Sequence, residues 1–331
     1  MNPASLASLL QSFFTQRMLE QQGLSSHTVA SYRDTFRLLL GFATQHFGRA
    51  PSKLLTQELD APFIENFLRH LEQSRGNSVR TRNTRLAAVH AFFRFVAISE
   101  PALALQCQRI LAIPAKRYEH SPVEFLTEEE AAALVAAPDA QTWIGLRDRT
   151  LLLVAVQTGL RNSELTSLRR QDIALGTGAH VRCLGKGRKM RCTPLSPDVI
   201  VSLKEWLQRQ PGAPADPAFP SSRGGHLSAD ALQRLVSRHA ATACQSCPSL
   251  KGKSVTPHSL RHSAAMSLLQ HGVELSVIAL WLGHESTETT QIYLHADMQL
   301  KERALAHANA NGLAPSRYMP PDPLLAFLEG L

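Results

Sequence analysis

Apolar residues recur at the spacing of α-helices along most of this chain, and one short stretch departs from that spacing. Helical periodicity dominates the first hundred residues, returns in an apolar run at 145–157, and resumes near Pro197. Between the last two, residues 181–184 and 190–194 flank a Gly-Lys-Gly turn, which is typical of a β-hairpin. The sequence therefore predicts a mainly α-helical protein with a small β-sheet.

The chain is long enough, at 331 residues, to form two domains. Prolines and basic residues between Ile113 and Pro122 mark a linker. Thr127 with Glu130 three residues later forms a capping box, which opens a new helix. We therefore predict an N-terminal helical domain, a linker, a second domain that contains the hairpin, and a C-terminal tail, at residues 1–112, 113–124, 125–311 and 312–331.

The tail is rich in proline and ends on a short apolar stripe from Leu324 to Leu331. A helix of this length is marginal alone and needs a surface on which to dock. That surface is either the tail's own domain or a neighbouring subunit.

Basic residues exceed acidic ones, with 35 Lys and Arg against 27 Asp and Glu, which gives a net charge of +8. Residues 1–118 alone hold 14 of the basic residues and 7 of the acidic ones. A second basic cluster lies between Arg161 and Arg191. Positive charge of this size suggests an acidic partner such as nucleic acid.

The five cysteines follow no secretory signal pattern, which favours a reduced, cytoplasmic setting. The longest aliphatic run, Leu151–Val156, is too short to span a bilayer, so we expect no membrane partner. Cys244 and Cys247 have the spacing of a zinc-ligand pair, but no second such pair accompanies them. We therefore expect reduced thiols and no bound metal.

Two basic motifs stand near the hairpin. In TGLRNSEL, residues 158–165, a helix ends at Gly159, and Arg161 and Glu164 then share one helix face. Taken alone, that pair is an ordinary surface ion pair. In GKGRK, residues 185–189, the glycines let the turn approach a phosphate, although a solvated basic turn would have the same sequence.

Two further motifs carry histidines. In TPHSLRH, residues 256–262, a Thr N-cap and a Pro start a helix whose first turn presents His258 and Arg261 on one face. Free backbone N–H groups at such a helix start favour an anion, and an imidazole exchanges protons near neutral pH. LGHESTETTQIYLH, residues 282–295, contains His284 and Tyr293. A lone tyrosine of this kind usually belongs to the core.

Together and in this order, the four motifs resemble the tyrosine recombinase (phage integrase) family, especially its Xer-type and mobile-element branch. The resemblance extends from about Leu24 to His307. It implies an N-terminal SAM-like core-binding domain and an α+β catalytic domain. It also implies a catalytic set of six residues, Arg161, Lys186, His258, Arg261, His284 and Tyr293.

The resemblance implies that Tyr293 attacks a DNA phosphodiester and forms a 3′-phosphotyrosyl bond, while a 5′-hydroxyl leaves. A partner strand's hydroxyl then reverses the attack, so neither metal, ATP nor another cofactor is needed. Arg161, Arg261 and His284 would stabilise the negative charge of the transition state. A metal-dependent nuclease would instead need several carboxylates.

Proton transfer is then left to the remaining groups, because arginine keeps its proton. By resemblance, Lys186 is the general acid, with Lys189 as a rival, and His258 is the base for Tyr293. Glu164 would orient the arginine cluster.

Double-stranded DNA is the expected partner, held between the two domains. Candidate contacts in the first domain are Ser26, His27, Thr28, Arg33, Arg75, Arg80, Arg82 and Arg85, and those in the second are Arg169, Arg170, Arg188 and Arg191. Any one of them could equally belong to a solvated face.

The resemblance further implies a homotetramer on two recombination sites, with the tail docked on the next subunit, in the cytoplasm at the bacterial nucleoid. A second recombinase could replace part of that assembly. Two alternatives stay open: a type IB topoisomerase-like DNA relaxase, and a non-catalytic DNA-binding regulator with the same fold. A mobile-element integrase is our preferred interpretation.

Overall fold

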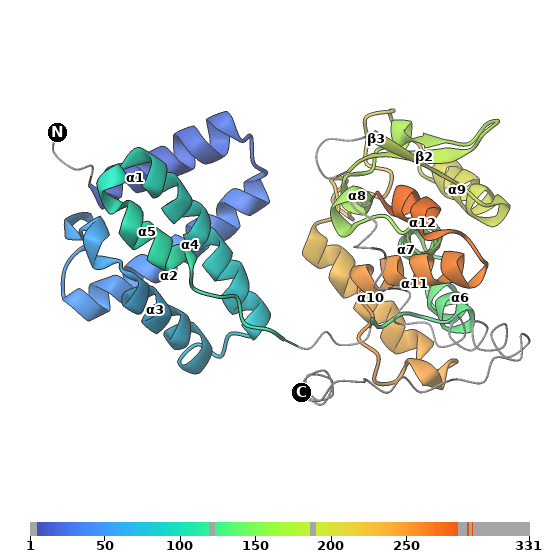
Figure 1. Ribbon diagram of the computed structural model, residues 1–331. Coiled ribbons are helices and arrows are strands. Elements are labelled where there is room, and N and C mark those ends of the chain that lie inside the picture. The colour runs from blue at the N-terminus through green and yellow to red at the C-terminus, as the bar shows by residue number, and fades with distance from the viewer. Residues whose placement is uncertain (1–4, 119–122, 186–189, 284–289, 291–292, 294–331) are drawn as a thin grey trace, which may run out of the picture. The chain divides into compact units, whose positions relative to one another are not determined.

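The computed structural model describes residues 5–118, 123–185, 190–283, 290 and 293 (Figure 1). The chain divides into two compact units, Met1–His120 and Ser121–Leu331, and this boundary falls inside the predicted linker. The described residues are mainly helical with one three-stranded sheet, so the predicted fold class is confirmed. The tail at 312–331 lies outside the described residues.

The N-terminal unit is a bundle of helices. Its longer elements are α1 (Leu6–Ser12), a π-helix (Phe13–Gln21), α2 (Ser26–Phe47), α3 (Ala61–Gln73), α4 (Val79–Ser99) and α5 (Ala104–Leu111). Three 3-10 turns connect them, at Pro51–Lys53, Thr56–Glu58 and Pro101–Leu103. The helix starts follow from the sequence, since Ser25, Asp60 and Ser78 each accept a hydrogen bond from a backbone N–H of the first turn.

Aromatic side chains form the centre of this bundle. The rings of Phe36 on α2 and Phe92 on α4 lie 5.1 Å apart, and Phe13 lies 5.4 Å from Phe92. These edge-on contacts join three elements that are far apart in the sequence.

The first residues of the predicted linker pack on the N-terminal unit. Ile113 is 5% exposed and belongs to its core. Arg82 on α4 donates to the Pro114 carbonyl over 3.0 Å, and Asn83 donates to the Lys116 carbonyl over 2.8 Å. The chain therefore leaves this unit only after Lys116.

The first residues after the predicted linker are fixed to the C-terminal unit in the same way. The Leu126 N–H donates to Ser263 Oγ over 2.8 Å. Lys253 Nζ donates to the Phe125 carbonyl over 3.2 Å and pairs with the buried Glu130. The start of the second unit is thus tied to the helix that contains Ser263.

The C-terminal unit surrounds one long apolar helix with shorter ones. Its helices are α6 (Glu128–Ala136), α7 (Trp143–Thr158), α8 (Asn162–Ser167), α9 (Pro197–Arg209), α10 (Ala229–Ala243), α11 (Pro257–Gln270) and α12 (Leu275–Leu282), with 3-10 turns at Arg170–Asp172 and Pro248–Leu250. The apolar run predicted at 145–157 forms α7, whose Leu151, Leu152 and Val154 are buried.

The sheet is antiparallel in the order β1 (Ile173–Ala174), β2 (His180–Leu184) and β3 (Met190–Pro194). Its β2–β3 hairpin, at the top of the C-terminal unit in Figure 1, pairs Cys183 with Arg191. The hairpin was predicted from the sequence, and its register brings Arg191 toward the core side of the strand.

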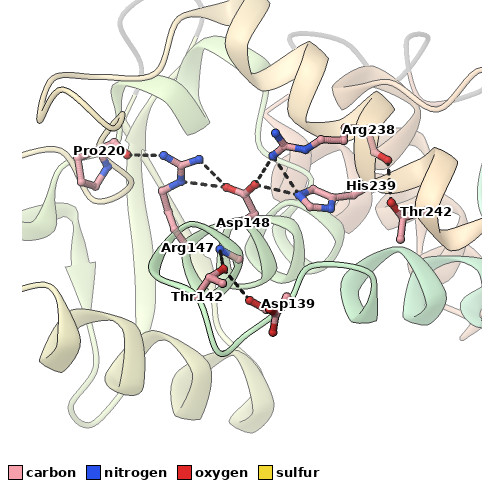
Figure 2. A network of polar contacts seen from close by, with 9 residues as sticks. Asp139, Thr142, Arg147, Asp148, Pro220, Arg238, His239 and Thr242 are labelled. Carbon is pink, nitrogen blue, oxygen red and sulfur yellow. Dashed lines mark hydrogen bonds and ion pairs between the residues drawn. The ribbon is translucent and has the colours of Figure 1, made fainter.

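A buried carboxylate holds α7 against α10 (Figure 2). Asp148 is 0% exposed and accepts from Arg147, Arg238 and His239 over 2.7, 2.8 and 2.9 Å. Arg147 also donates to the Pro220 carbonyl. Burial raises the pKa of Asp148, but the hydrogen bond from His239 and the charge of Arg147 outweigh it, so the pKa lies below its usual value.

Within the described ranges, no helix is both long and apolar enough to cross a membrane. The same residues contain no cluster of three His, Cys, Asp or Glu side chains that could hold a metal ion.

Candidate active site

Glu164 stands at the centre of a cluster of cationic side chains. Arg161 donates to its carboxylate from Nη1 over 3.0 Å and from the backbone N–H over 2.7 Å. Arg191 of β3 donates to the same carboxylate through both terminal nitrogens, each over 2.7 Å. The predicted Arg161–Glu164 pair is therefore present, with Arg191 as a second partner.

Burial raises the pKa of Glu164, which is 5% exposed, but the bonds from Arg191 and Arg161 lower it by more. The carboxylate is consequently charged at neutral pH and fixes both guanidinium groups. Both carboxylate oxygens accept hydrogen bonds from the two arginines.

Arg261 joins the cluster from α11. Its guanidinium, 4% exposed, donates to the carbonyls of Gly159 and Leu282 over 2.7 Å each. Arg161 donates in turn to the Gly283 carbonyl over 2.8 Å. The two arginines are thus fixed by the carboxyl ends of α7 and α12.

The site is strongly cationic. Burial, together with the charges of Arg161 and Arg191, lowers the pKa of Arg261 to about 10. Three guanidinium groups surround one carboxylate, so an added anion would relieve their mutual repulsion. This arrangement fits the binding of a phosphate group.

Gly159 permits the close approach of these elements. It ends α7 with a φ of +62°, and a Cβ there would lie 2.7 Å from Leu282 Cδ2 and 3.1 Å from Ala264 Cβ. Both the left-handed backbone and the lack of space require glycine. The glycine of the TGLR motif therefore brings α7, α11 and α12 together.

Tyr293 lies beside α11 and α12. Its side chain is 1% exposed among apolar residues that include Met266 and Ile278. Its hydroxyl and His262 Nδ1 share a hydrogen bond of 2.9 Å, and the His262 ring lies edge-on to His258, with ring centres 4.2 Å apart. Burial raises the pKa of Tyr293 to about 12, and the charge of Arg261 opposes that rise.

Four of the six predicted catalytic residues are described, and they occupy one region of the C-terminal unit. Arg161 and Arg261 bind the neighbouring carbonyls of Gly283 and Leu282. The charge of Arg261 acts on Tyr293, and His258 contacts the ring of His262, which binds Tyr293. The remaining two, Lys186 and His284, lie outside the described residues, as does Lys189, the rival for the acid role.

Sequence reasoning missed the contact of His262 with Tyr293 and the contact of Arg191 with Glu164. A signal existed for the first, since His262 lies one helical turn after His258 and adjoins Arg261. For Arg191 the signal was weaker, because only the strand register decides which hairpin residues face Glu164.

The candidate DNA contacts of the N-terminal unit fall into two groups. Ser26, His27, Arg33, Arg75 and Arg80 are exposed, and Thr28 is half-buried. Arg33 pairs with its exposed neighbour Asp34.

The other two candidates of that unit serve its interior. Arg82 is 6% exposed and binds the Pro114 carbonyl. Arg85 donates to the Ser31 carbonyl and to Thr35 Oγ1. Both guanidinium groups thereby hold elements of their own unit together.

In the C-terminal unit, Arg169 is exposed and Arg188 lies outside the described residues. Arg170 donates to the carbonyls of Leu207 and Gln210, and Arg191 is bound to Glu164. These two arginines support the fold and the cationic cluster.

Comparison with known proteins identifies the class that this fold and site define. The family described as "Phage integrase family" matches residues 124–300, and "Phage integrase, N-terminal SAM-like domain" matches residues 12–100. The chain belongs to the phage integrase family, and its enzyme class is that of the tyrosine-type site-specific recombinases.

Individual relatives agree with that family. A Sinorhizobium fredii protein named as an integrase/recombinase, y4rC, is 53% identical over 328 residues, which cover 99% of each chain. The tyrosine recombinase XerC of Rhodospirillum centenum is 37% identical over 290 residues, 86% of this chain and 82% of XerC.

The fold is also similar to solved recombinases. The XerH site-specific recombinase, bound to its palindromic difH substrate after cleavage, matches with a TM-score of 0.65 and 25% identity. The match covers 82% of this chain and 78% of XerH. The predicted family, SAM-like domain and enzyme class are thereby confirmed.

Proposed function

We propose that this recombinase cleaves and rejoins DNA strands through a 3′-phosphotyrosyl intermediate, with Tyr293 as the nucleophile and without metal or ATP. The observation that carries the proposal is that Tyr293 packs beside Leu282, whose carbonyl binds Arg261, and that the charge of Arg261 lowers the pKa of Tyr293. Arg261 in turn belongs to a cationic cluster with Arg161 and Arg191. A phosphodiester fits that cluster because it needs fixed positive charge as its oxygens become more negative.

Arg161 and Arg261 are the proposed ligands of the non-bridging phosphate oxygens. Their guanidinium groups are held by backbone carbonyls and by Glu164, so they need little reorganisation when phosphate binds. Arg261 keeps its proton at neutral pH even with a pKa of about 10. Removal of one such donor typically slows a reaction about 10²–10³-fold.

The remaining roles stay as the sequence predicts them. Lys186, or Lys189 in its place, protonates the leaving 5′-oxygen, His284 donates to the phosphate, and His258 is the proposed base.

We also propose that both units bind double-stranded DNA. The exposed candidates carry this proposal, namely Ser26, His27, Arg33, Arg75, Arg80 and Arg169, with Thr28 at the edge of the same group. Arg82, Arg85 and Arg170 are left out of the proposed contacts, because their guanidinium groups bind carbonyls inside their own units.

A homotetramer on two recombination sites, with the tail docked on the next subunit, is the proposed working assembly. Its proposed setting is the cytoplasm, at the nucleoid, and its proposed role is that of a mobile-element integrase. The 53% identity to the integrase/recombinase y4rC supports that role.

The first test is a nicked suicide duplex that carries the DNA flanking the protein's own gene. Wild type should form an SDS-resistant protein–DNA adduct, and Tyr293→Phe should form none while binding the same DNA. An adduct that persists in Tyr293→Phe would contradict the assignment of the nucleophile. Tight binding without an adduct in either protein would favour a non-catalytic regulator.

The topoisomerase alternative has its own control. A relaxase would remove supercoils from any plasmid, whereas the proposed recombinase should rearrange only plasmids that carry two copies of its site.

A further inference from the structure

We infer that His262 accepts the proton of the Tyr293 hydroxyl and holds that hydroxyl in place while it attacks phosphorus. This inference rests on the proposed function and assigns a residue that the family resemblance left without a role. The observation behind it is the 2.9 Å hydrogen bond between His262 Nδ1 and the Tyr293 hydroxyl.

The position of His262 is fixed by the helix that carries it. Thr256 caps α11 by accepting a hydrogen bond from the Ser259 N–H, and Ser263 on the same helix accepts one from the Leu126 N–H. Since Arg261 directly precedes His262, one rigid helical turn presents both a phosphate ligand and a proton acceptor.

Tyr293 needs such an acceptor. Its phenol is buried among apolar side chains, and burial raises its pKa to about 12, so it is almost entirely protonated at neutral pH. A phenol of this kind becomes a useful nucleophile only when a base in contact takes its proton during attack. His262 makes that contact, and its half-buried ring also packs edge-on against the exposed ring of His258.

The proton balance closes without a further reagent. As the phenol oxygen bonds to phosphorus, its proton moves to His262 Nδ1, which requires a neutral imidazole protonated at Nε2. The bond from phosphorus to the 5′-oxygen breaks, and the proposed lysine acid protonates that oxygen. On ligation, the incoming 5′-hydroxyl loses its proton to the lysine, and His262 returns its proton to the departing tyrosine.

His258 then has a different place. Its ring is exposed and lies edge-on to His262, whose Nδ1 shares the hydrogen bond with the Tyr293 hydroxyl. We therefore assign direct acceptance of the tyrosine proton to His262, in place of His258, the base that the family resemblance suggests.

The test compares two substitutions with different chemistry. His262→Asn places an amide oxygen near the former Nδ1, which keeps a hydrogen-bond acceptor but takes up no proton. His262→Ala removes both functions and leaves space for free imidazole. His271→Asn is the matched control, since His271 lies at the end of the same helix with its side chain 66% exposed.

Single-turnover cleavage of the nicked duplex at saturating DNA is the main readout. We expect both His262 variants to cleave about 10²–10³-fold more slowly, with an unchanged Kd for DNA. Free imidazole should restore part of the rate of His262→Ala and none of that of His262→Asn. His271→Asn should match wild type. Wild-type cleavage by His262→Asn, or no rescue of His262→Ala, would overturn the proton-transfer role.

A spectroscopic readout separates this inference from the proposed function. The chain has four tyrosines, so ring-labelled tyrosine gives few NMR signals, and Tyr293→Phe identifies the one that matters. His262→Ala should shift the Tyr293 signal and leave that of Tyr32 unchanged. An unmoved Tyr293 signal would overturn the inference. A shifted signal in a protein that forms no adduct would reject the proposed chemistry while retaining the contact.

Discussion

Arg80 and Arg82 differ by two positions on α4 and have opposite environments. Arg80 is exposed, whereas Arg82 is 6% exposed and bound to the Pro114 carbonyl. Arg82 lies on the same face of α4 as the buried Leu86, Val89 and Phe93, because each follows the one before it by three or four residues. A two-residue step turns a helix by more than half a circle, so the neighbouring arginine faces solvent.

Replacement of the two arginines should therefore change different properties of the protein, DNA binding for Arg80 and stability for Arg82. Arg80→Ala should weaken DNA binding. It should also reduce the slope of log K against log salt concentration by about 0.9 in magnitude, the value for one phosphate contact. Arg82→Ala should leave that slope unchanged and lower the free energy of unfolding by about 1–3 kcal/mol, because it orphans buried groups. Binding titrations at several salt concentrations and urea unfolding measure the two effects. An unchanged slope in Arg80→Ala would remove Arg80 from the proposed DNA contacts.

At the scale of elements, the proposed active site depends on where helices end. The carboxyl ends of α7 and α12 supply the carbonyls that bind Arg261 and Arg161, and the start of α11 supplies Arg261 itself. A shift of any of these ends would move a guanidinium group. The helix boundaries therefore position the side chains of the proposed site.

Gly159→Ala tests this dependence, with Gly48→Ala as its matched control. Both glycines end a helix with a positive φ, of +62° and +67°, but a Cβ at Gly48 meets nothing within 4 Å. Gly48→Ala should cost about 1–2 kcal/mol of unfolding free energy from backbone strain alone. Gly159→Ala should cost about 1–3 kcal/mol more from its contact with Leu282, and should also slow cleavage.

Thermal or urea unfolding gives the first quantity and single-turnover cleavage the second. Equal losses of stability in the two variants would contradict the packing argument.

Across the whole molecule, the two units differ in how they use acidic residues. The C-terminal unit buries Glu130, Asp148 and Glu164, each bound to cationic side chains. Burial raises the pKa of each, but bonds from Lys253, His239 and Arg191 lower it by more, so every one of these pKa values lies below its usual range. Among the described residues of the N-terminal unit, no Asp or Glu is buried.

Acid should therefore destabilise the C-terminal unit first. A carboxylate whose pKa is lower in the folded state stabilises it above the unfolded pKa, about 4.5 for Glu and 3.8 for Asp. That contribution is lost as the pH falls below those values toward the folded pKa.

Fluorescence can separate the two units, because all three tryptophans, Trp143, Trp206 and Trp281, lie in the C-terminal unit. On acidification below about pH 4.5, tryptophan fluorescence should change while part of the helical circular dichroism remains. The remaining signal is that of the helices of the N-terminal unit. Asp148→Asn should make the stability of the C-terminal unit less dependent on pH. A single transition seen equally by both probes would refute this prediction.

Much of the fold could be predicted from the sequence, because local rules decide it. Apolar spacing gave α7, the Thr127 capping box gave the start of α6, and the Gly-Lys-Gly turn gave the hairpin of β2 and β3. The order of the motifs gave the family, and the TGLR and HxxR motifs gave Arg161, Glu164 and Arg261 as one cluster, which the structure also contains.

Only the tertiary structure decided which side chains meet across elements. The bond of Arg191 to Glu164 depends on the register of β3, and that of His262 to Tyr293 depends on how Tyr293 packs against α11 and α12. Apolar periodicity shows which face of a helix is buried, but a buried arginine such as Arg82 carries no apolar signal of its own. Caps and turns arise within a few residues of sequence, whereas these contacts join residues 27 and 31 positions apart, so only packing brings them together.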